Sequence, residues 1–187
     1  MTDTSHRNET LSTIFSRSSY RGLFTGTPVP RHDLETILRA GIAAPSGCNR
    51  QTTAFVAVDD PDRVARIKQI FRRPSCDTAP AFILIFTREI PGVDGHNYNI
   101  EDFSAAVENM LLAIKSLGYE SCWYQGGIRN CLEPLRAVVR MPDPYRLICL
   151  LPVGVAAEPL HSAAEKKPFG ERAWFNEYTP DAPQSHV

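Results

Sequence analysis

The 187-residue chain is 43% hydrophobic and nearly neutral, with 20 Lys and Arg residues against 21 Asp and Glu residues. This length and composition predict one domain, residues 1–187, with a sizeable core, and the balanced charge gives no electrostatic case for nucleic acid or an anionic membrane as partner. No apolar run is long enough to span a bilayer and the first ten residues are polar, so we expect a cytoplasmic protein.

Two helices are predicted before the first strand. Leu11, Ile14 and Phe15 share one face of the first helix. The second helix must end before Pro45, because proline disfavours helical backbone in the residue that precedes it. Its apolar residues recur at spacings of three and four, and they are Leu34, Ile37, Leu38 and Ile42. The first strand is then expected at Ala54–Val58.

The middle of the chain predicts a helix, a buried strand and the longest helix. Asp60 is a suitable N-cap with Pro61 in the first helical position, and Ala81–Thr87 is apolar almost throughout, as is typical of a buried strand. The longest helix is expected to begin at Asp102 and to end at Gly118. Because its apolar residues cover more than one face, we expect it to be buried in the domain or at a subunit contact.

The last predicted elements are a strand at Ser121–Tyr124, a helix capped by Asn130 and a strand at Leu147–Val155. Helices and strands are interspersed, and two helices precede the first strand. This order favours an α+β fold over a doubly wound parallel sheet. The polar tail at 179–187 is expected to lack fixed structure.

Cysteine and histidine spacing argues against a disulfide framework and a metal site. The five cysteines are odd in number and form no C-x-x-C pair, and the five histidines are scattered without metal-ligand spacing. Cys122 and Cys149 lie in apolar runs and are expected to be buried, unreactive thiols.

The segment Arg17–Arg21 follows the first helix and combines cations with hydroxyl groups, which together can bind phosphate oxygens. Taken alone, it fits a solvated basic helix end better, because cations are common there. A second cationic set near the end of the chain could complete a phosphate site, although a solvated tail also explains it. The candidate residues are Arg17, Ser18, Ser19 and Arg21 in the first set and Lys166, Lys167 and Arg172 in the second.

Two turns could present polar groups to a ring system. The loop Ala44–Gln51 suits a rigid turn that meets the edge of a heterocycle, and an ordinary connection explains it equally well. A glycine pair after the predicted strand at 121–124 permits close approach by a ligand or forms a β-bulge. The candidates are Pro45, Ser46 and Asn49 in the first turn and Gln125 and Gly126 in the second. Rossmann, P-loop and nucleophile-elbow motifs are missing.

In this order, the segments resemble the nitroreductase family of FMN-dependent oxidoreductases over about Leu11–Tyr178. The family pattern R-x-S-x-R is present, and A-P-S-x-x-N-x-Q-P-W is matched except that Thr52-Thr53 replace Pro-Trp. The helix ending in G-L-G-[ST]-x-W is similar to Asp102–Trp123, with Glu120 in place of the second glycine. The matching residues are Arg17, Ser19, Arg21, Ala44, Pro45, Ser46, Asn49, Gln51, Asn109, Gly118, Ser121, Trp123, Pro142, Tyr145, Pro152, Val153 and Gly154.

The resemblance implies an α+β fold with a central mixed sheet flanked by helices, in an intertwined homodimer with two FMN sites at its interface. It implies that the FMN phosphate and ribityl chain are held by Arg17, Ser18, Ser19 and Arg21, with further phosphate cations at Lys166, Lys167 and Arg172. It also implies that the flavin ring meets Gln125 and Gly126 of the same subunit and Pro45, Ser46 and Asn49 of the other.

The activity that the resemblance implies is transfer of a hydride from NADH or NADPH through FMN to a small electron-poor acceptor, such as a nitroaromatic or a quinone. Arg21 and Arg73 are candidate cations for the charge on the reduced ring. The alternatives are a specialised flavin-dependent dehydrogenase, a non-catalytic flavin-binding protein and a structural domain without cofactor. The segment 72–95 is compact where relatives carry helices that shape the substrate pocket, so the substrate is not implied.

Overall fold

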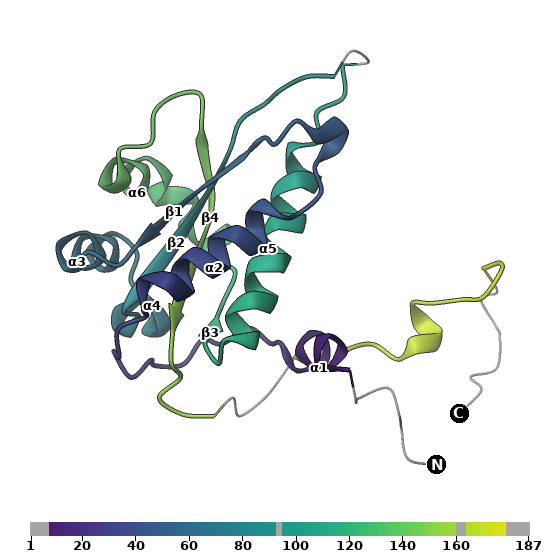
Figure 1. Cartoon of the computed structure of the whole chain (residues 1–187), viewed down its shortest axis with the longest axis horizontal. Helices are drawn as coiled ribbons and strands as arrows, with labels where there is room; N and C mark the ends of the chain where they lie inside the picture. Colours follow the sequence, from purple (N-terminus) through teal and green to yellow (C-terminus); the bar gives the residue numbers. More distant parts are fainter. Residues whose placement is uncertain (1–7, 93–94, 160–163, 179–187) are drawn as a thin grey trace.

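The computed structural model describes residues 8–92, 95–159 and 164–178, and it places a four-stranded sheet between two layers of helices (Figure 1). The strands are β1 (Thr53–Val58), β2 (Ala81–Thr87), β3 (Glu120–Ser121) and β4 (Arg146–Gly154), in the order β1-β2-β4-β3. One face of the sheet is covered by α2 (Arg31–Ile42) and α5 (Asn99–Ser116). The other is covered by α3 (Pro61–Ile70), α4 (Pro74–Thr78) and α6 (Leu132–Val139).

The predicted α+β class is confirmed, but the described strands pair only in antiparallel fashion, whereas a mixed sheet was expected. The crossover through α5 leaves β2 and β3 pointing the same way, as expected for strands joined by one helix. β4 lies between these two strands and pairs antiparallel with both. Parallel strands are therefore present but are not neighbours.

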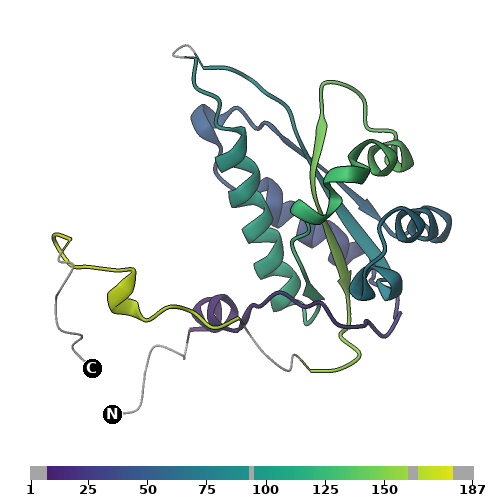
Figure 2. The same ribbon diagram turned by 180° about the vertical axis from the view of Figure 1, so that it is seen from behind.

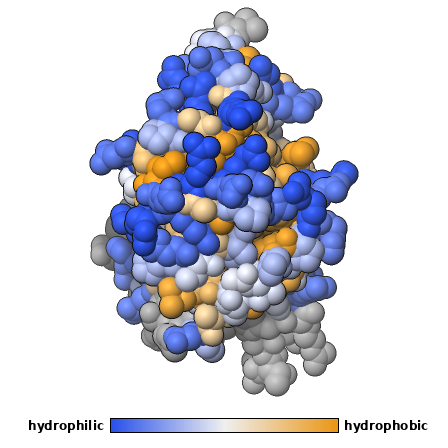
Figure 3. Space-filling view, turned by 90° about the vertical axis from the view of Figure 1, so that its left-hand side faces the viewer, coloured by the Kyte–Doolittle hydropathy of each residue, from blue (hydrophilic) through white to orange (hydrophobic). Residues whose placement is uncertain are grey.

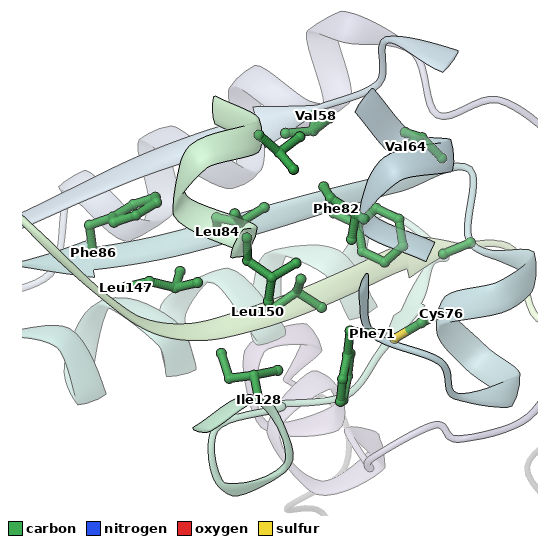
Figure 4. Packing of buried hydrophobic residues seen from close by; sticks show 14 of the residues in the cluster. Val58, Val64, Phe71, Cys76, Phe82, Leu84, Phe86, Ile128, Leu147 and Leu150 are labelled. Atoms are coloured by element: carbon green, nitrogen blue, oxygen red, sulfur yellow. The ribbon is translucent and has the colours of Figure 1, made fainter. Parts of the chain in front are cut away.

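β2 lies at the centre of the core, and all seven of its residues are buried. Phe82, Leu84 and Phe86 face the layer of α3 and α6 (Figure 4), and the intervening Ile83 and Ile85 face α2 and α5. Successive side chains of a strand point to opposite faces, so burial on both faces requires a continuous apolar run. This confirms the prediction of a buried strand at Ala81–Thr87.

Most of the other predicted elements are confirmed within a residue or two. The first helix is α1 (Glu9–Ser16), and Asp60 caps α3 by accepting from the Arg63 N–H at 3.1 Å. Gly118 ends α5 with a φ of +83°, a left-handed conformation that glycine adopts without strain. No helix among the described residues is long and apolar enough to cross a membrane, and no group of potential metal ligands occurs there.

Three element boundaries were predicted wrongly. α5 begins at Asn99, three residues before the expected start, because Asp102 bonds to a distant loop instead of capping the helix. Asn130 does not cap α6, since it lies within the 3-10 turn η3 (Gly126–Cys131) that leads into that helix. The strand expected at Ser121–Tyr124 is reduced to β3, and Tyr124 forms a single bridge to Leu150.

The outer surfaces of the molecule differ in character. The side formed by α3 and α6 carries mostly hydrophilic side chains (Figure 3). By contrast, α1 has no buried residue, and its Leu11, Ile14 and Phe15 are exposed. The segment 164–178 extends beyond α1, away from the sheet, in both views (Figures 1 and 2). Its aromatic residues Phe169, Trp174, Phe175 and Tyr178 are exposed.

Candidate functional site

The segment Arg17–Arg21 is held against the edge of the sheet. α1 ends at Ser16, and the chain then runs extended, so that the Tyr20 N–H donates to the Ser121 carbonyl at 2.8 Å. Tyr20 is buried, and the Ser19 side chain hydrogen-bonds with Cys122. The segment is therefore fixed beside β3, with Ser18 and Ser19 half-buried and Arg21 exposed.

The two arginines of this segment are placed differently. Arg17 Nε lies 3.0 Å from Glu108 Oε1 on α5, but it is buried and donates no hydrogen bond. Arg21 lies within electrostatic reach of Cys122: burial raises the pKa of that thiol, and the Arg21 charge opposes the rise. Two cations close together, one of them with a buried N–H that makes no hydrogen bond, suit an anion, although Glu108 already balances part of the Arg17 charge.

Gln125 and Gly126 directly follow Tyr124, which lies within electrostatic reach of Arg21. The bridge between Tyr124 and Leu150 fixes the backbone just before them, and the Trp123 indole donates to Gln125 Oε1 at 3.1 Å. No atom would lie within 4 Å of a Cβ added at Gly126. The backbone at Gly126 is therefore open to a ligand.

Arg73 and Ser75, at the start of α4, lie near Gly127 and Tyr124. The Arg73 guanidinium lies 5.2 Å from the centre of the Phe71 ring, and one of its nitrogens lies 3.9 Å from the position of an added Gly127 Cβ. Ser75 is buried, and its hydroxyl lies 2.9 Å from the Tyr124 hydroxyl. The sequence patterns did not identify Ser75, because the five-residue α4 is too short to show helical periodicity.

The loop that contains Pro45, Ser46 and Asn49 lies elsewhere. Its 3-10 turn η2 (Gly47–Asn49) contacts the first turn of α5, where the Gly47 N–H donates to Asp102 Oδ1 at 2.7 Å. Cys48, Asn49 and Gln51 have positive φ values of 52°, 54° and 51°. The loop thus holds an uncommon backbone shape that exposes Pro45, Cys48 and Asn49.

The two sets of candidate residues contact α5 at different points. Its first turn holds the Pro45–Asn49 loop through Asp102, and Arg17 pairs with Glu108 six residues further along the helix. The Trp123 indole, which donates to Gln125, packs on Phe103 with the ring centres 6.4 Å apart. Figure 1 shows α1 near the C-terminal end of α5. Among the described residues, no hydrogen bond or ion pair joins Pro45–Asn49 to Arg17–Arg21 or to Gln125 and Gly126.

The third predicted set lies on the extended segment. Lys166, Lys167 and Arg172 are all exposed, and Lys167 pairs with Glu171 at 3.5 Å. The polar tail at 179–187 lies outside the described residues.

Comparisons with known proteins are consistent with the motifs. The model of the nitroreductase family matches residues 14–75 and 68–155. An Archaeoglobus fulgidus protein assigned as an NADH dehydrogenase/NAD(P)H nitroreductase is 32% identical over 150 residues, covering 78% of this chain and 84% of that protein. Iodotyrosine deiodinase 1 of Rattus norvegicus is 26% identical over 181 residues, covering 79% of this chain and 62% of that protein, which is thus substantially longer.

More distant relatives and solved structures agree in fold. The FMN reductase (NADPH) of Bacillus subtilis is 22% identical over 190 residues, covering 92% of this chain and 74% of that protein. A Bacteroides thetaiotaomicron structure, assigned the same activities as the archaeal protein, has a TM-score of 0.76 at 25% identity and covers 91% of this chain and 99% of its own. Nitroreductase A of Vibrio parahaemolyticus has a TM-score of 0.77 at 22% identity, and the match covers 92% of this chain and 78% of that one. A likeness at this identity shows the fold alone.

Proposed function

This chain belongs to the nitroreductase family, and from that premise we propose that it is an FMN-dependent oxidoreductase. In this proposal a hydride passes from NADH or NADPH, by way of FMN, to a small electron-poor acceptor such as a nitroaromatic or a quinone. The observation that carries the proposal is that Arg21 lies within electrostatic reach of Cys122 and Tyr124, just before the open backbone at Gly126.

The residues present fit FMN. The Arg17 and Arg21 guanidinium groups and the Ser18 and Ser19 hydroxyls would hold the terminal phosphate, and the buried Arg17 Nε, which pairs with Glu108, donates no hydrogen bond to any described residue. Gln125 and Gly126 would present backbone N–H groups to the polar edge of the ring, where Gly126 leaves room for close approach. One phosphate-binding cluster suits a mononucleotide better than a dinucleotide.

We further propose that the site is completed by a second copy of the chain. Pro45, Ser46 and Asn49 would then meet the flavin held by the partner's phosphate-binding residues, because no hydrogen bond or ion pair among the described residues links them to Arg17–Arg21 of the same chain. The exposed aromatics of 164–178 and the apolar face of α1 would be covered in such a dimer. The segment 164–178 would also bring further cations, Lys166, Lys167 and Arg172, to the phosphate of a bound FMN.

The chemistry of hydride transfer comes from the bound flavin, while the protein orients the ring and adjusts its charge. Arg73 lies beside Gly127 and Arg21 lies within electrostatic reach of Tyr124, and both cations would stabilise negative charge at the edge of the reduced ring. Burial raises the pKa of Tyr124, which makes its hydroxyl a weaker acid. We therefore assign proton supply to water rather than to Tyr124.

The names of two relatives support a reductase over the alternatives. The Archaeoglobus fulgidus protein is assigned as an NAD(P)H nitroreductase, and the Bacillus subtilis relative is an FMN reductase that uses NADPH. A flavin-dependent dehydrogenase would instead pass electrons from its substrate to flavin and oxygen. A non-catalytic flavin carrier would bind the flavin without turning over NADH or NADPH.

An absorbance spectrum is the first test. The purified protein is expected to be yellow, or to take up FMN but not FAD. NADH or NADPH should then bleach the bound flavin without oxygen, and a quinone or nitroaromatic should restore the colour. Equal affinity for FAD would contradict the phosphate assignment. A colourless protein that is indifferent to FMN would contradict the proposal as a whole.

A further inference from the structure

Asp102 is a buried acidic residue that none of the functional roles above uses. It lies in the first turn of α5 and is only 2% exposed. A carboxylate removed from water is costly unless its oxygens accept hydrogen bonds. Its partners therefore indicate why the position carries an acid.

Both oxygens of Asp102 are used, and both bind the loop that follows α2. Oδ1 accepts from the Gly47 N–H at 2.7 Å, and Oδ2 accepts from the Thr52 hydroxyl at 2.6 Å. Thr52 is itself buried. The carboxylate thus joins the two ends of the segment 47–52, and Asp102 connects this segment to a rigid 18-residue helix.

The segment between these two anchors has a backbone shape that needs support. Cys48, Asn49 and Gln51 all lie in the left-handed region, which non-glycine residues adopt at a cost. Inside the turn the Gln51 N–H donates to Ser46 Oγ at 3.1 Å. On its outer side the Tyr98 ring lies so close to Gly47 that a side chain there would collide with it. The loop is therefore held from α5 at two points.

We propose that Asp102 is a positioning residue for flavin binding, which fixes the Pro45–Asn49 loop in the shape that meets the ring. The proposal rests on the proposed function, because it takes this loop to be the one that contacts FMN. Asp102 itself does not touch the flavin. It acts by holding the Gly47 N–H and the Thr52 hydroxyl, so that Asn49 is presented in one orientation.

The first test compares Asp102→Ala with Glu101→Ala, its exposed neighbour in the same turn. Loss of two charge-assisted hydrogen bonds should weaken FMN binding by about tenfold or more, while the control should bind like the wild type. Asp102→Asn keeps an oxygen for the Gly47 N–H and should fall between the two. Equal affinity in the Asp102→Ala variant and the wild type would overturn the proposal.

If Asp102→Ala does not fold, Asp102→Asn and Thr52→Val carry the same test. Each removes or weakens one of the two contacts and leaves the rest of α5 intact. Both are expected to bind FMN measurably less tightly and to shift the visible circular dichroism of the flavin, which reports its surroundings. Wild-type affinity and an unchanged spectrum in both variants would overturn the proposal.

Subunit mixing separates a local role from a general weakening of the fold. In a mixture of Asp102→Ala and Arg17→Glu subunits, one site of each heterodimer has a wild-type loop and wild-type phosphate residues, so about half of the heterodimer sites should regain FMN. The reference mixture pairs Asn49→Asp with Arg17→Glu. Recovery in the reference mixture alone would overturn the positioning role. Failure of both mixtures would overturn the shared site, and the proposal with it.

Discussion

Strand β2 and the segment 164–178 are both rich in apolar side chains, but only β2 is covered by its own chain. Phe82 on β2 is 0% exposed, whereas Phe175 on the segment is 81% exposed. Other segments of the same chain pack on both faces of β2. Two ring pairs lie within the segment 164–178, and the centres of the Trp174 and Tyr178 rings are 4.7 Å apart.

This difference separates the parts of the molecule that a single copy covers from those that stay exposed. The sheet and its two helical layers form a closed core, which fixes Tyr20 beside Ser121 and Arg21 near Tyr124. The large aromatics of 164–178 stay exposed, as do Pro45 and Asn49 of the loop. Both are accounted for if a second copy covers the aromatics and brings its loop to the flavin.

Truncation of Phe82 should have the largest effect on stability. Phe82→Ala leaves a cavity in a fully buried site and should lower the free energy of unfolding by about 3–5 kcal/mol. Urea denaturation followed by circular dichroism measures this change. A loss below about 1 kcal/mol would mean that the core around β2 is less complete than the structure shows.

Charge reversal in the phosphate site should affect binding and leave the fold intact. Arg17→Glu or Arg21→Glu removes a charge-assisted contact worth about 1.5–3 kcal/mol and adds repulsion, so FMN affinity should fall at least about tenfold. Fluorescence titration with FMN measures the effect, and unfolding of the apoprotein provides the control. Wild-type affinity in both variants would remove these residues from the site.

Truncation of Phe175, an exposed counterpart of Phe82, should weaken the dimer. Phe175→Ala removes an exposed side chain, so a monomer should lose less than about 0.5 kcal/mol of stability. In a homodimer both rings are lost, and burial of each phenylalanine contributes about 1.5–3 kcal/mol, so the dissociation constant of the dimer should rise about a hundredfold or more. Sedimentation at a series of concentrations distinguishes the two cases. An unchanged dimer constant would leave Phe175 outside the interface.

Thiol labelling should show the smallest effect and still separate exposed from buried regions. Cys48 is exposed, in the loop that we propose to contact the flavin. By contrast, burial raises the pKa of the Cys76 thiol to about 12. Because the thiolate is the reactive form, Cys76 should stay protonated and unreactive at pH 9. Iodoacetamide followed by peptide mass spectrometry should therefore find Cys48 modified first, and bound FMN should slow that reaction. Early modification of Cys76 would contradict the packing around α4.

The sequence predicted those features that depend on neighbouring residues. The start of α3 followed from Asp60-Pro61, and β2 followed from a run that is apolar on both faces. The role of Asp102 was not predictable in this way, because Gly47 and Thr52 lie 55 and 50 positions away in the chain. From the sequence alone, a lone acid at the start of an apolar helix predicts a helix boundary.

The candidate site shows the same limit. The order of the motifs identified Arg17–Arg21, Pro45–Asn49 and Gln125–Gly126 as separate candidates. Only the structure shows that Arg21 lies near Tyr124, just before the third candidate, and that Asp102 holds the second against the first turn of α5. Periodicity describes a side chain relative to its own helix or strand, and it contains no information on which elements share an end of the sheet.

We propose that each flavin site takes residues from two subunits. Subunit mixing is the most direct test of this proposal. Arg17→Glu and Asn49→Asp subunits, each a weak FMN binder alone, are combined and allowed to exchange. One site in every heterodimer then contains both wild-type elements, so about half of the heterodimer sites should recover FMN. No recovery after exchange has been verified, or a monomer by light scattering, would contradict the shared site.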